Sequence, residues 1–366
     1  MRAQGVDKVF LGIIIVLILS GFIILSSASM GLLSRSSGFY YKILFQQFLY
    51  GIVGGTILLL ISLNIDYKFW KKFSLLIFIF GLLITALVFI PGIGVSRGGA
   101  SRWIDLGPIS FHPSEILKFG FIIYLSSWLS SRKKNIKSFK SGVIPFIIIM
   151  SLVAIVLIKQ PDIGTLGVFA ITGLIMFFIA GAETKHLLLL LIIGAIIFGI
   201  LIWIEPYRLN RVKTFLYHDI DTKGISYQLK QSLIAIGSGG LFGRGFGMSL
   251  QKFTYLPEPI SDSIFSVFAE EFGFIGCTFL LILFMSFLFK GISISMNSPD
   301  DFSKLLSAGI VIMITIESLI NISSMIGLIP MTGVPLNFIS KGGTALAITL
   351  LEMGVLLNIS KYRNNA

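Results

Sequence analysis

The sequence has little charge, almost no cysteine and few histidines. Asp, Glu, Lys and Arg make up 13% of its 366 residues, about half the share found in soluble domains, and this excludes an ordinary soluble protein. The single cysteine, Cys277, lies in an apolar run, which excludes an internal disulfide and a cysteine-based metal site.

Acidic residues are scarce relative to basic ones, 17 against 29, so the formal net charge is +12. A basic protein can bind nucleic acid, but here the densest basic cluster lies between two apolar runs: Arg132, Lys133, Lys134, Lys137 and Lys140. It lacks the interleaved aromatic residues that stack on bases. We therefore interpret the cluster as a membrane topology signal, and nucleic acid is not an expected partner.

Hydrophobic residues make up 55% of the chain and form runs long enough to cross a bilayer as helices. The predicted spans are Val9–Leu25, Ile43–Leu63, Phe73–Ile90, Ser114–Leu129, Val143–Ile158, Ile163–Ile179, Leu187–Ile204, Ile264–Phe289, Leu305–Ile326 and Thr344–Ile359. The sequence therefore predicts an all-α integral membrane protein of about ten transmembrane helices, forming a single polytopic domain over residues 1–366. The first run is interpreted as a helix rather than a cleavable signal peptide, because more spans follow it.

Lys and Arg in the short loops predict the orientation. With a cytoplasmic N-terminus, the inner loops hold the basic cluster together with Lys68, Lys71, Lys72, Lys185, Lys290, Lys304, Lys361 and Arg363. The short outer loops hold fewer cations, namely Arg35, Arg97, Arg102, Lys159 and Lys341. Both termini are therefore expected in the cytoplasm, and the long loop of about residues 205–262 is expected outside as a partly ordered cap.

A first polar cluster runs from Gly98 and Gly99 through Arg102 and Trp103 to Glu115 and Lys118. One interpretation is a turn with an interfacial tryptophan, followed by a helix that begins at Pro113 and Ser114 with Glu115 in its first turn. The other is a cationic wall at the outer membrane surface, where Arg102 would hold an anionic headgroup and Trp103 would stack on a sugar.

A second cluster surrounds Asp262, at the junction of the long loop with the eighth span. Aspartate at such a position is usually a helix N-cap. A carboxylate near several cations is also suited to be a general base or a metal ligand. Glu270 and Glu271 follow about two turns into the helix, where carboxylates are costly unless they face protein or water.

A third cluster, Gly327–Gly343, contains prolines and glycines that forbid a regular helix. It is either a tight connection or backbone that lines a polar cavity. Glu317 and Glu352 lie in the last two predicted helices. Each is expected to face the bundle interior and either to pair with Lys341 or to form hydrogen bonds.

These clusters together resemble the SEDS family (shape, elongation, division and sporulation) of ten-span peptidoglycan glycosyltransferases, over nearly the whole chain. The resemblance rests on Arg102-Trp103-Ile104, Pro113-Ser114-Glu115 with Lys118, Gln160-Pro161-Asp162-Ile163-Gly164-Thr165, Leu256-Pro257-Glu258 with Asp262, and Ala269–Gly276. Gln251-Lys252, Gly333–Leu336 and Leu357–Ser360 are more similar to the division member FtsW than to the elongation member RodA.

The resemblance implies polymerisation of lipid II during septal wall synthesis, with inversion at the anomeric carbon and Asp262 as the general base. It places the active site outside the cytoplasmic membrane and implies these substrate-binding residues: Arg102, Trp103, Glu115, Lys118, Gln160, Asp162, Glu258, Ser340, Lys341 and Gly342. It also implies a class B penicillin-binding protein and other division proteins as partners. A divalent cation, Mg²⁺ or Mn²⁺, is a possible cofactor with Asp262 as a ligand, and no organic cofactor is expected.

The chain departs from the family pattern around the aspartate. Ile260, Ser261 and Ser263 flank Asp262 where the family has His-Thr and Phe, and Lys341 replaces a tyrosine. Glu317 stands where a glutamine is common. Two alternatives therefore stay open: a lipid II flippase or transporter that uses Glu317 and Glu352, and a non-catalytic scaffold that recruits a transpeptidase. No paired halves of the transporter type are evident in the sequence.

Overall fold

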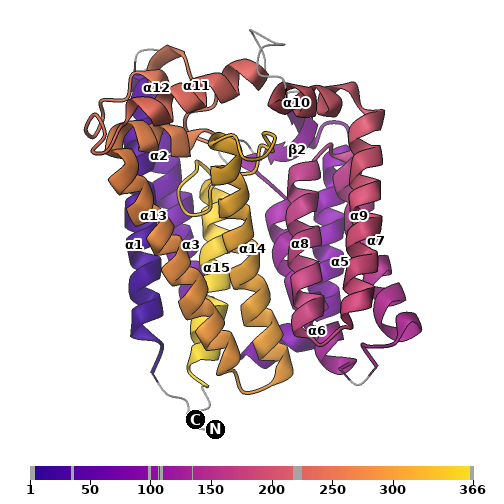
Figure 1. Ribbon diagram of the computed structural model, residues 1–366. Helices are drawn as coiled ribbons and strands as arrows, with labels where there is room; N and C mark the ends of the chain where they lie inside the picture. The colour runs from indigo at the N-terminus through magenta and orange to yellow at the C-terminus, as the bar shows by residue number, and fades with distance from the viewer. Residues whose placement is uncertain are drawn as a thin grey trace.

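The structure, a computed structural model, describes residues 5–33, 37–97, 100–105, 107, 110–133, 135–216 and 225–362. It is a bundle of long helices in which α1 begins and α15 ends at the same end (Figure 1). Helices α10–α12 and a small sheet lie at the opposite end (Figure 1). Several residues used in the sequence analysis lie outside the described residues: Arg35, Gly98, Gly99, Lys134 and Arg363.

The first half of the chain forms α1 (Lys8–Ser29), η1 (Met30–Leu32), α2 (Ser37–Gln46), η2 (Gln47–Val53), α3 (Gly54–Asn64), α4 (Tyr67–Lys72), α5 (Ser74–Ala86), η3 (Leu87–Phe89), β1 (Gly94–Arg97), β2 (Ala100–Asp105), β3 (Ser110–Phe111), α6 (Ser114–Ser131), η4 (Phe139–Val143), α7 (Ile144–Lys159) and α8 (Ile163–Ile179). The second half forms α9 (Thr184–Ile204), α10 (Pro206–Leu216), α11 (Ile225–Ser238), α12 (Gln251–Thr254), α13 (Ile264–Met296), α14 (Asp301–Met325) and α15 (Gly343–Ser360).

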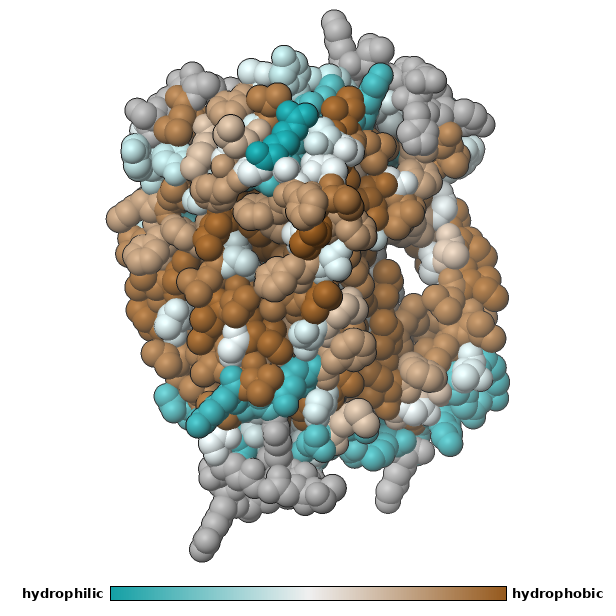
Figure 2. All heavy atoms as spheres, turned by 60° about the vertical axis from the view of Figure 1, so that its left-hand side comes forward, coloured by the Kyte–Doolittle hydropathy of each residue, from teal (hydrophilic) through white to brown (hydrophobic). Residues whose placement is uncertain are grey.

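All ten predicted spans coincide with helices. Among the described residues, seven helical segments are long and apolar enough to cross a membrane, and α5 with η3 and α8 are shorter apolar helices. The tenth is α6, whose charged Glu115 and Lys118 lower its hydropathy. On the face shown in Figure 2, hydrophobic side chains cover the middle and hydrophilic side chains gather toward the two ends. The prediction of an all-α multi-pass membrane protein is confirmed.

The helix ends differ from the predicted ends where a polar partner compensates a charge. The eighth span continues beyond Phe289 to Met296, because Lys290 is a good helix former and its charge is paired with Asp7 at 3.1 Å. The ninth begins at Asp301 rather than Leu305, because the Asp300 side chain accepts a hydrogen bond from a backbone N–H of the first turn.

A three-stranded antiparallel sheet, β1-β2-β3, precedes α6 and was not predicted. Val95 pairs with Trp103, and Ile104 pairs with Phe111. These β-branched and aromatic residues suit a pleated surface. The predicted helix start is confirmed, since α6 begins at Ser114. The sheet fixes the backbone of β2, from which Arg102 projects.

The long loop is mostly helical in its described part. Helices α10, α11 and α12 lie across the end of the bundle (Figure 1), as an ordered cap should. Between α11 and α12 runs a glycine-rich segment, residues 239–247, with positive φ at Gly240, Gly243, Gly245 and Gly247. Such angles are costly for other residues, so the glycines set the path of this segment.

The glycine-rich segment fills a break in α13. The helix is interrupted at Gly273, where φ is 62° and ψ is −163°. The carbonyls of Glu270 and Glu271 accept hydrogen bonds from Arg244 N and Gly245 N, both at 3.0 Å. On the other side of the break, Phe274 N and Ile275 N donate to carbonyls of the loop at 2.9 and 3.1 Å. The loop therefore satisfies the backbone groups that the break exposes, as required for irregular backbone in a membrane protein.

Candidate active site

Asp262 lies between α12 and α13 and is partly exposed. The interpretation of Asp262 as a helix cap is wrong, because the N-cap of α13 is Ser263 and no side chain caps this helix. Within the described part of the chain, the Asp262 carboxylate has no hydrogen-bond or ion-pair partner. Its two oxygens are therefore available to a substrate.

The main chain around Asp262 is held by hydrogen bonds from residues later in the chain. Three successive carbonyl oxygens accept hydrogen bonds from residues between positions 321 and 341. The pairs are Ile260 O with Lys341 N at 2.8 Å, Ser261 O with Ser340 Oγ at 2.7 Å, and Asp262 O with Asn321 Nδ2 at 2.9 Å. The aspartate thus has a free side chain on a tightly held backbone.

The electrostatic surroundings of Asp262 combine two cations with two acids. Burial raises the pKa of its carboxyl to about 6, and Glu258 acts in the same direction, as Asp162 does to a smaller extent. Arg211 and Arg102 oppose this increase. A carboxyl with such a pKa is mostly ionised at neutral pH and is basic enough to accept a proton.

Arg102 holds the short hairpin between α7 and α8. Its Nε donates to Gln160 O at 3.2 Å, and its Nη2 donates to Pro161 O. Its Nη1 lies 3.6 Å from Asp162 Oδ1. Gln160 in turn donates from Nε2 to Thr85 O at 2.7 Å. The structure thus brings Arg102, Gln160 and Asp162 together. Many of their hydrogen-bonding groups already have partners within the protein.

Trp103 packs against His112 rather than standing alone at the interface. The two rings meet edge to face with centroids 4.8 Å apart. His112 Nδ1 and Ser114 Oγ are hydrogen-bonded at 2.5 Å. Burial lowers the pKa of His112 to about 4; Asp162 opposes this decrease, and Lys118 and Arg102 add to it. The imidazole is therefore neutral at neutral pH and adds no cation to the site.

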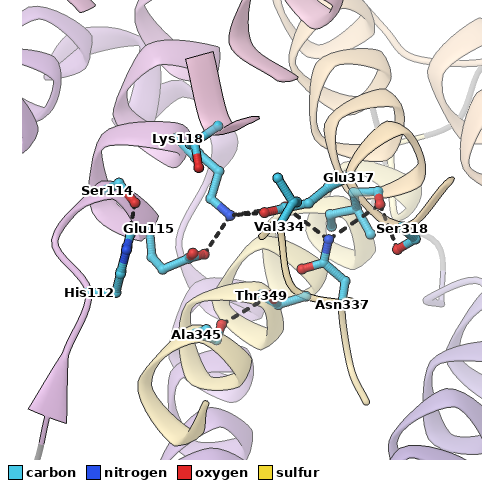
Figure 3. Close-up of polar contacts among 12 residues, drawn as sticks. His112, Ser114, Glu115, Lys118, Glu317, Ser318, Val334, Asn337, Ala345 and Thr349 are labelled. Carbon is cyan, nitrogen blue, oxygen red and sulfur yellow. Dashed lines mark hydrogen bonds and ion pairs between the residues drawn. The ribbon is translucent and has the colours of Figure 1, made fainter. Parts of the chain in front are cut away.

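Glu115 and Lys118 belong to a buried charged network between α6 and α14 (Figure 3). Lys118 Nζ lies 2.8 Å from Glu115 Oε2 and 2.8 Å from Glu317 Oε1. Asn337 Nδ2 donates to Glu317 Oε2 at 2.9 Å. The network therefore links α6 to the Gly327–Gly343 segment, and it presents Lys118 to two carboxylates of the protein itself.

Glu317 and Glu352 were expected to pair with Lys341 or to form hydrogen bonds. Glu317 pairs with Lys118 instead. Glu352 is 5% exposed, and its carboxyl has no hydrogen bond or ion pair with the described residues. The Lys341 ammonium lies 6.0 Å from the centre of the Phe39 ring. The proposed pairing of Lys341 with either acid is therefore wrong.

The Gly327–Gly343 segment is irregular, as predicted, and packs beside the aspartate. Gly342 N donates to Gln47 Oε1 at 3.0 Å, which ties the segment to η2. Ser340 and Lys341 bond to the main chain next to Asp262, and Glu258 lies four residues before it with its Oε2 accepting from Ser261 Oγ at 2.8 Å. Ser340, Lys341 and Glu258 therefore contact the residues next to Asp262, whereas Gly342 contacts η2.

Glu270 and Glu271 hold the long loop and face protein. Glu270 accepts from Ser249 Oγ at 2.5 Å and from Leu250 N at 3.1 Å. Glu271 pairs with the buried ammonium of Lys252 at 2.6 Å. Both acids therefore have structural partners at the break in α13.

Comparison with known proteins identifies the family. The chain matches the family of cell cycle proteins that comprises FtsW, RodA and SpoVE, over residues 7–365. This chain belongs to the FtsW/RodA/SpoVE family. It is 42% identical to stage V sporulation protein E of Bacillus subtilis over 84% of both chains. It is 34% identical to a probable peptidoglycan glycosyltransferase FtsW of Geobacter sp., over 100% of this chain and 99% of that protein.

Two solved structures share the fold of this FtsW/RodA/SpoVE member. One is a chain of a peptidoglycan synthase complex that coordinates polymerization and crosslinking, with a TM-score of 0.82 and 24% identity over 99% of both chains. The other is the rod shape determining protein RodA of Thermus thermophilus, with a TM-score of 0.72 and 23% identity over 98% of both chains.

The sequence analysis missed several residues of this family member's site. Arg211 exerts the strongest cationic effect on Asp262 and donates from Nη1 to Met331 O at 2.9 Å. Asn321 donates to the main-chain carbonyl of Asp262, and Asn337 donates to Glu317 from the segment that packs beside the aspartate. The signal that could have identified Arg211 was the pair Arg208 and Arg211, three residues apart on a predicted outer loop. Asn321, a single asparagine in an apolar helix, and Asn337, in the irregular segment, gave no such signal.

The acidic residues do not form a closed metal site. Among the described residues, no group of three or more His, Cys, Asp or Glu side chains is placed to hold a metal ion. Mg²⁺ is often held by one or two carboxylates and by substrate phosphates. The residues present fit that arrangement with Asp262 as the protein ligand.

Proposed function

We propose that this chain polymerises lipid II into glycan strands during cell division, with Asp262 as the general base. The observation that carries the proposal is the unpartnered Asp262 carboxylate, with a pKa near 6, beside Arg102 and Arg211. Membership of a family whose curated members include FtsW glycosyltransferases supports the activity. The similarity to proteins named FtsW also favours division over elongation.

The reaction moves a growing glycan from its undecaprenyl diphosphate carrier to a sugar hydroxyl of another lipid II. The Asp262 carboxylate accepts the hydroxyl proton as the oxygen attacks the anomeric carbon from the face opposite the diphosphate. The bond from that carbon to the phosphate oxygen breaks, and undecaprenyl diphosphate leaves with the electron pair. A single displacement of this kind inverts the anomeric centre.

Arg102 and Arg211 are the cations we assign to the departing diphosphate. Guanidinium groups match phosphate oxygens through paired N–H donors, and preorganised cations stabilise charge that develops in the transition state. Lys118 is a weaker candidate than the sequence suggested, because it is buried and paired with two carboxylates at 2.8 Å, whereas Arg102 is partly exposed and faces one carboxylate at 3.6 Å. Mg²⁺ or Mn²⁺ bound at Asp262 would supply further charge to the diphosphate.

We infer the location of the site from the loop charges, together with its place in the fold. The Asp262 site lies on the long-loop side of the bundle, opposite the ends of α1 and α15 (Figure 1). Because the basic loops are expected in the cytoplasm, we place both termini there and the site outside. A class B penicillin-binding protein is the proposed partner, since the related complex couples polymerization to crosslinking.

The test is glycan synthesis from labelled lipid II by the purified protein with its cognate transpeptidase. Asp262→Asn should lower turnover by roughly 10²–10⁴-fold, while Asp301→Asn, at an exposed ion pair with Lys133, should retain it. Near-normal turnover of Asp262→Asn would remove the base from the mechanism.

Two other functions predict different results for the wild-type protein and its Asp262 variants. A lipid II flippase using the buried Lys118, Glu317 and Glu352 would move labelled lipid II across vesicles without forming strands. A scaffold would support division in cells that carry Asp262→Ala, whereas a polymerase would not.

A further inference from the structure

One buried amide joins Asp262 to the segment that follows α14. Asn321 is 0% exposed, and its Nδ2 donates to Asp262 O at 2.9 Å and to Val334 O at 2.7 Å. Both N–H groups of one planar amide are thus directed at two different main-chain segments. The distance between Asp262 and Val334 is set by a side chain of α14.

Ser340 makes a second connection between the same segments. Its hydroxyl donates to Ser261 O at 2.7 Å and accepts from Leu336 N at 2.9 Å. The only hydroxyl proton is therefore used within the protein. Ser340 was expected to bind substrate, but its hydrogen bonds are those of a residue that holds the chain in place.

The side chain of Asp262 depends on the position of this second segment. Gly333 has a φ of +74°, and a Cβ added to it would lie 3.5 Å from Asp262 Oδ2. The Gly333 turn therefore forms one wall beside the carboxylate. Since Asn321 holds the next carbonyl, that of Val334, it fixes the carboxylate's main chain and its neighbouring wall together.

We infer that Asn321 and Ser340 are positioning residues for Asp262. The inference rests on the proposed role of Asp262 as the base. Neither residue is assigned a contact with the reacting atoms. They hold the main chain of residues 261 and 262 against the 333–340 segment, so that the carboxylate keeps its place as the hydroxyl proton is transferred. Displacement of a catalytic group by about 1 Å can cost roughly 10²-fold in rate.

The experiment compares Asn321→Ala, Ser340→Ala and Ser340→Thr in the polymerase assay with the cognate transpeptidase. Both alanine variants should lower kcat by roughly 10- to 100-fold, with KM for lipid II within about twofold of wild type. Ser340→Thr keeps a hydroxyl donor and should recover most of kcat. The double alanine variant should lose less than the product of the two single effects, because both bonds hold one segment.

Asn358→Ala is the matched control. Asn358 is 2% exposed on α15, and its Nδ2 donates to Leu63 O at 2.8 Å, but it lies at the other end of the bundle from Asp262. Thermal unfolding in detergent measures the folding cost of each variant. A positioning role requires that Asn321→Ala lose far more kcat than Asn358→Ala at a similar loss of melting temperature.

Two results would overturn the inference. One is a kcat within about threefold of wild type for Asn321→Ala. The other is equal kcat losses in Asn321→Ala and Asn358→Ala, which would indicate general destabilisation. Either result with an inactive Asp262→Asn protein would reject the positioning role alone, whereas an active Asp262→Asn protein would reject the proposed base.

Discussion

The backbone of Gly243 lies directly against that of Gly273. A Cβ added to Gly273 would lie 2.3 Å from Gly243 N, and a Cβ added to Gly243 would lie 2.1 Å from Glu271 O. The φ angles are 62° and 78°, so a side chain at either position is strained as well as crowded. The break in α13 and the loop that fills it therefore depend on the same two glycines.

Gly273→Ala should destabilise the protein markedly. Strain in this backbone region alone costs roughly 1–3 kcal/mol, and the clash with Gly243 adds to it. The measurement is thermal unfolding in detergent. Gly167→Ala is the control, because a Cβ there meets nothing within 4 Å. Equal melting temperatures for Gly273→Ala and wild type would contradict the close packing of loop and helix.

The turnover of the polymerase should fall in acid through protonation of Asp262. The pKa of this carboxyl is raised to about 6, so its basic form is present above that pH and is lost as the pH falls through it. Initial rates at saturating lipid II between pH 5 and 8 would show a single acid limb. Arg211→Gln should move this limb to higher pH, because the guanidinium opposes protonation of Asp262. A limb that stays in place would contradict the proximity of these two residues.

Removing Lys118 should be far more harmful than neutralising Glu317. Lys118→Met leaves Glu115 and Glu317 buried without their cation, and breaking a buried ion pair in this way costs about 3–5 kcal/mol. Glu317→Gln keeps Lys118 paired with Glu115 and retains an acceptor for Asn337. Melting temperatures of the two variants test the contrast. Similar losses of melting temperature in both variants would contradict this, and would show that Glu115 alone does not compensate the charge of Lys118.

The sequence predicted the spans well because each is a long apolar run bounded by polar residues. Ile163–Ile179 agrees with α8 at both ends, since Asp162 caps its start and Gly181 follows its end. The small sheet before α6 was missed, because its strands are two to six residues long and two glycines separate the first pair.

The site was predicted in outline and missed in detail. Arg102 and Asp162 lie close enough to each other and to Asp262 to influence its carboxylate, as the family resemblance of their three motifs implied. The pairing of Glu317 with Lys118 could not be predicted, because 199 positions separate them along the chain. The same holds for Asn321, whose role depends on which carbonyls the folded chain brings to its amide.

The interrupted α13 affects how the chain is completed during synthesis. Four of the hydrogen bonds at its break come from residues 240–245, which leave the ribosome before the helix does. In lipid, unpaired backbone groups cost several kcal/mol each, so an inserted α13 without this segment would carry unpaired groups at its break. We expect the break to be satisfied only when the glycine-rich segment packs against it, at the end of the bundle opposite the N-terminus (Figure 1). A reporter protein fused within residues 240–245 would therefore arrest assembly of this span rather than simply mark its topology.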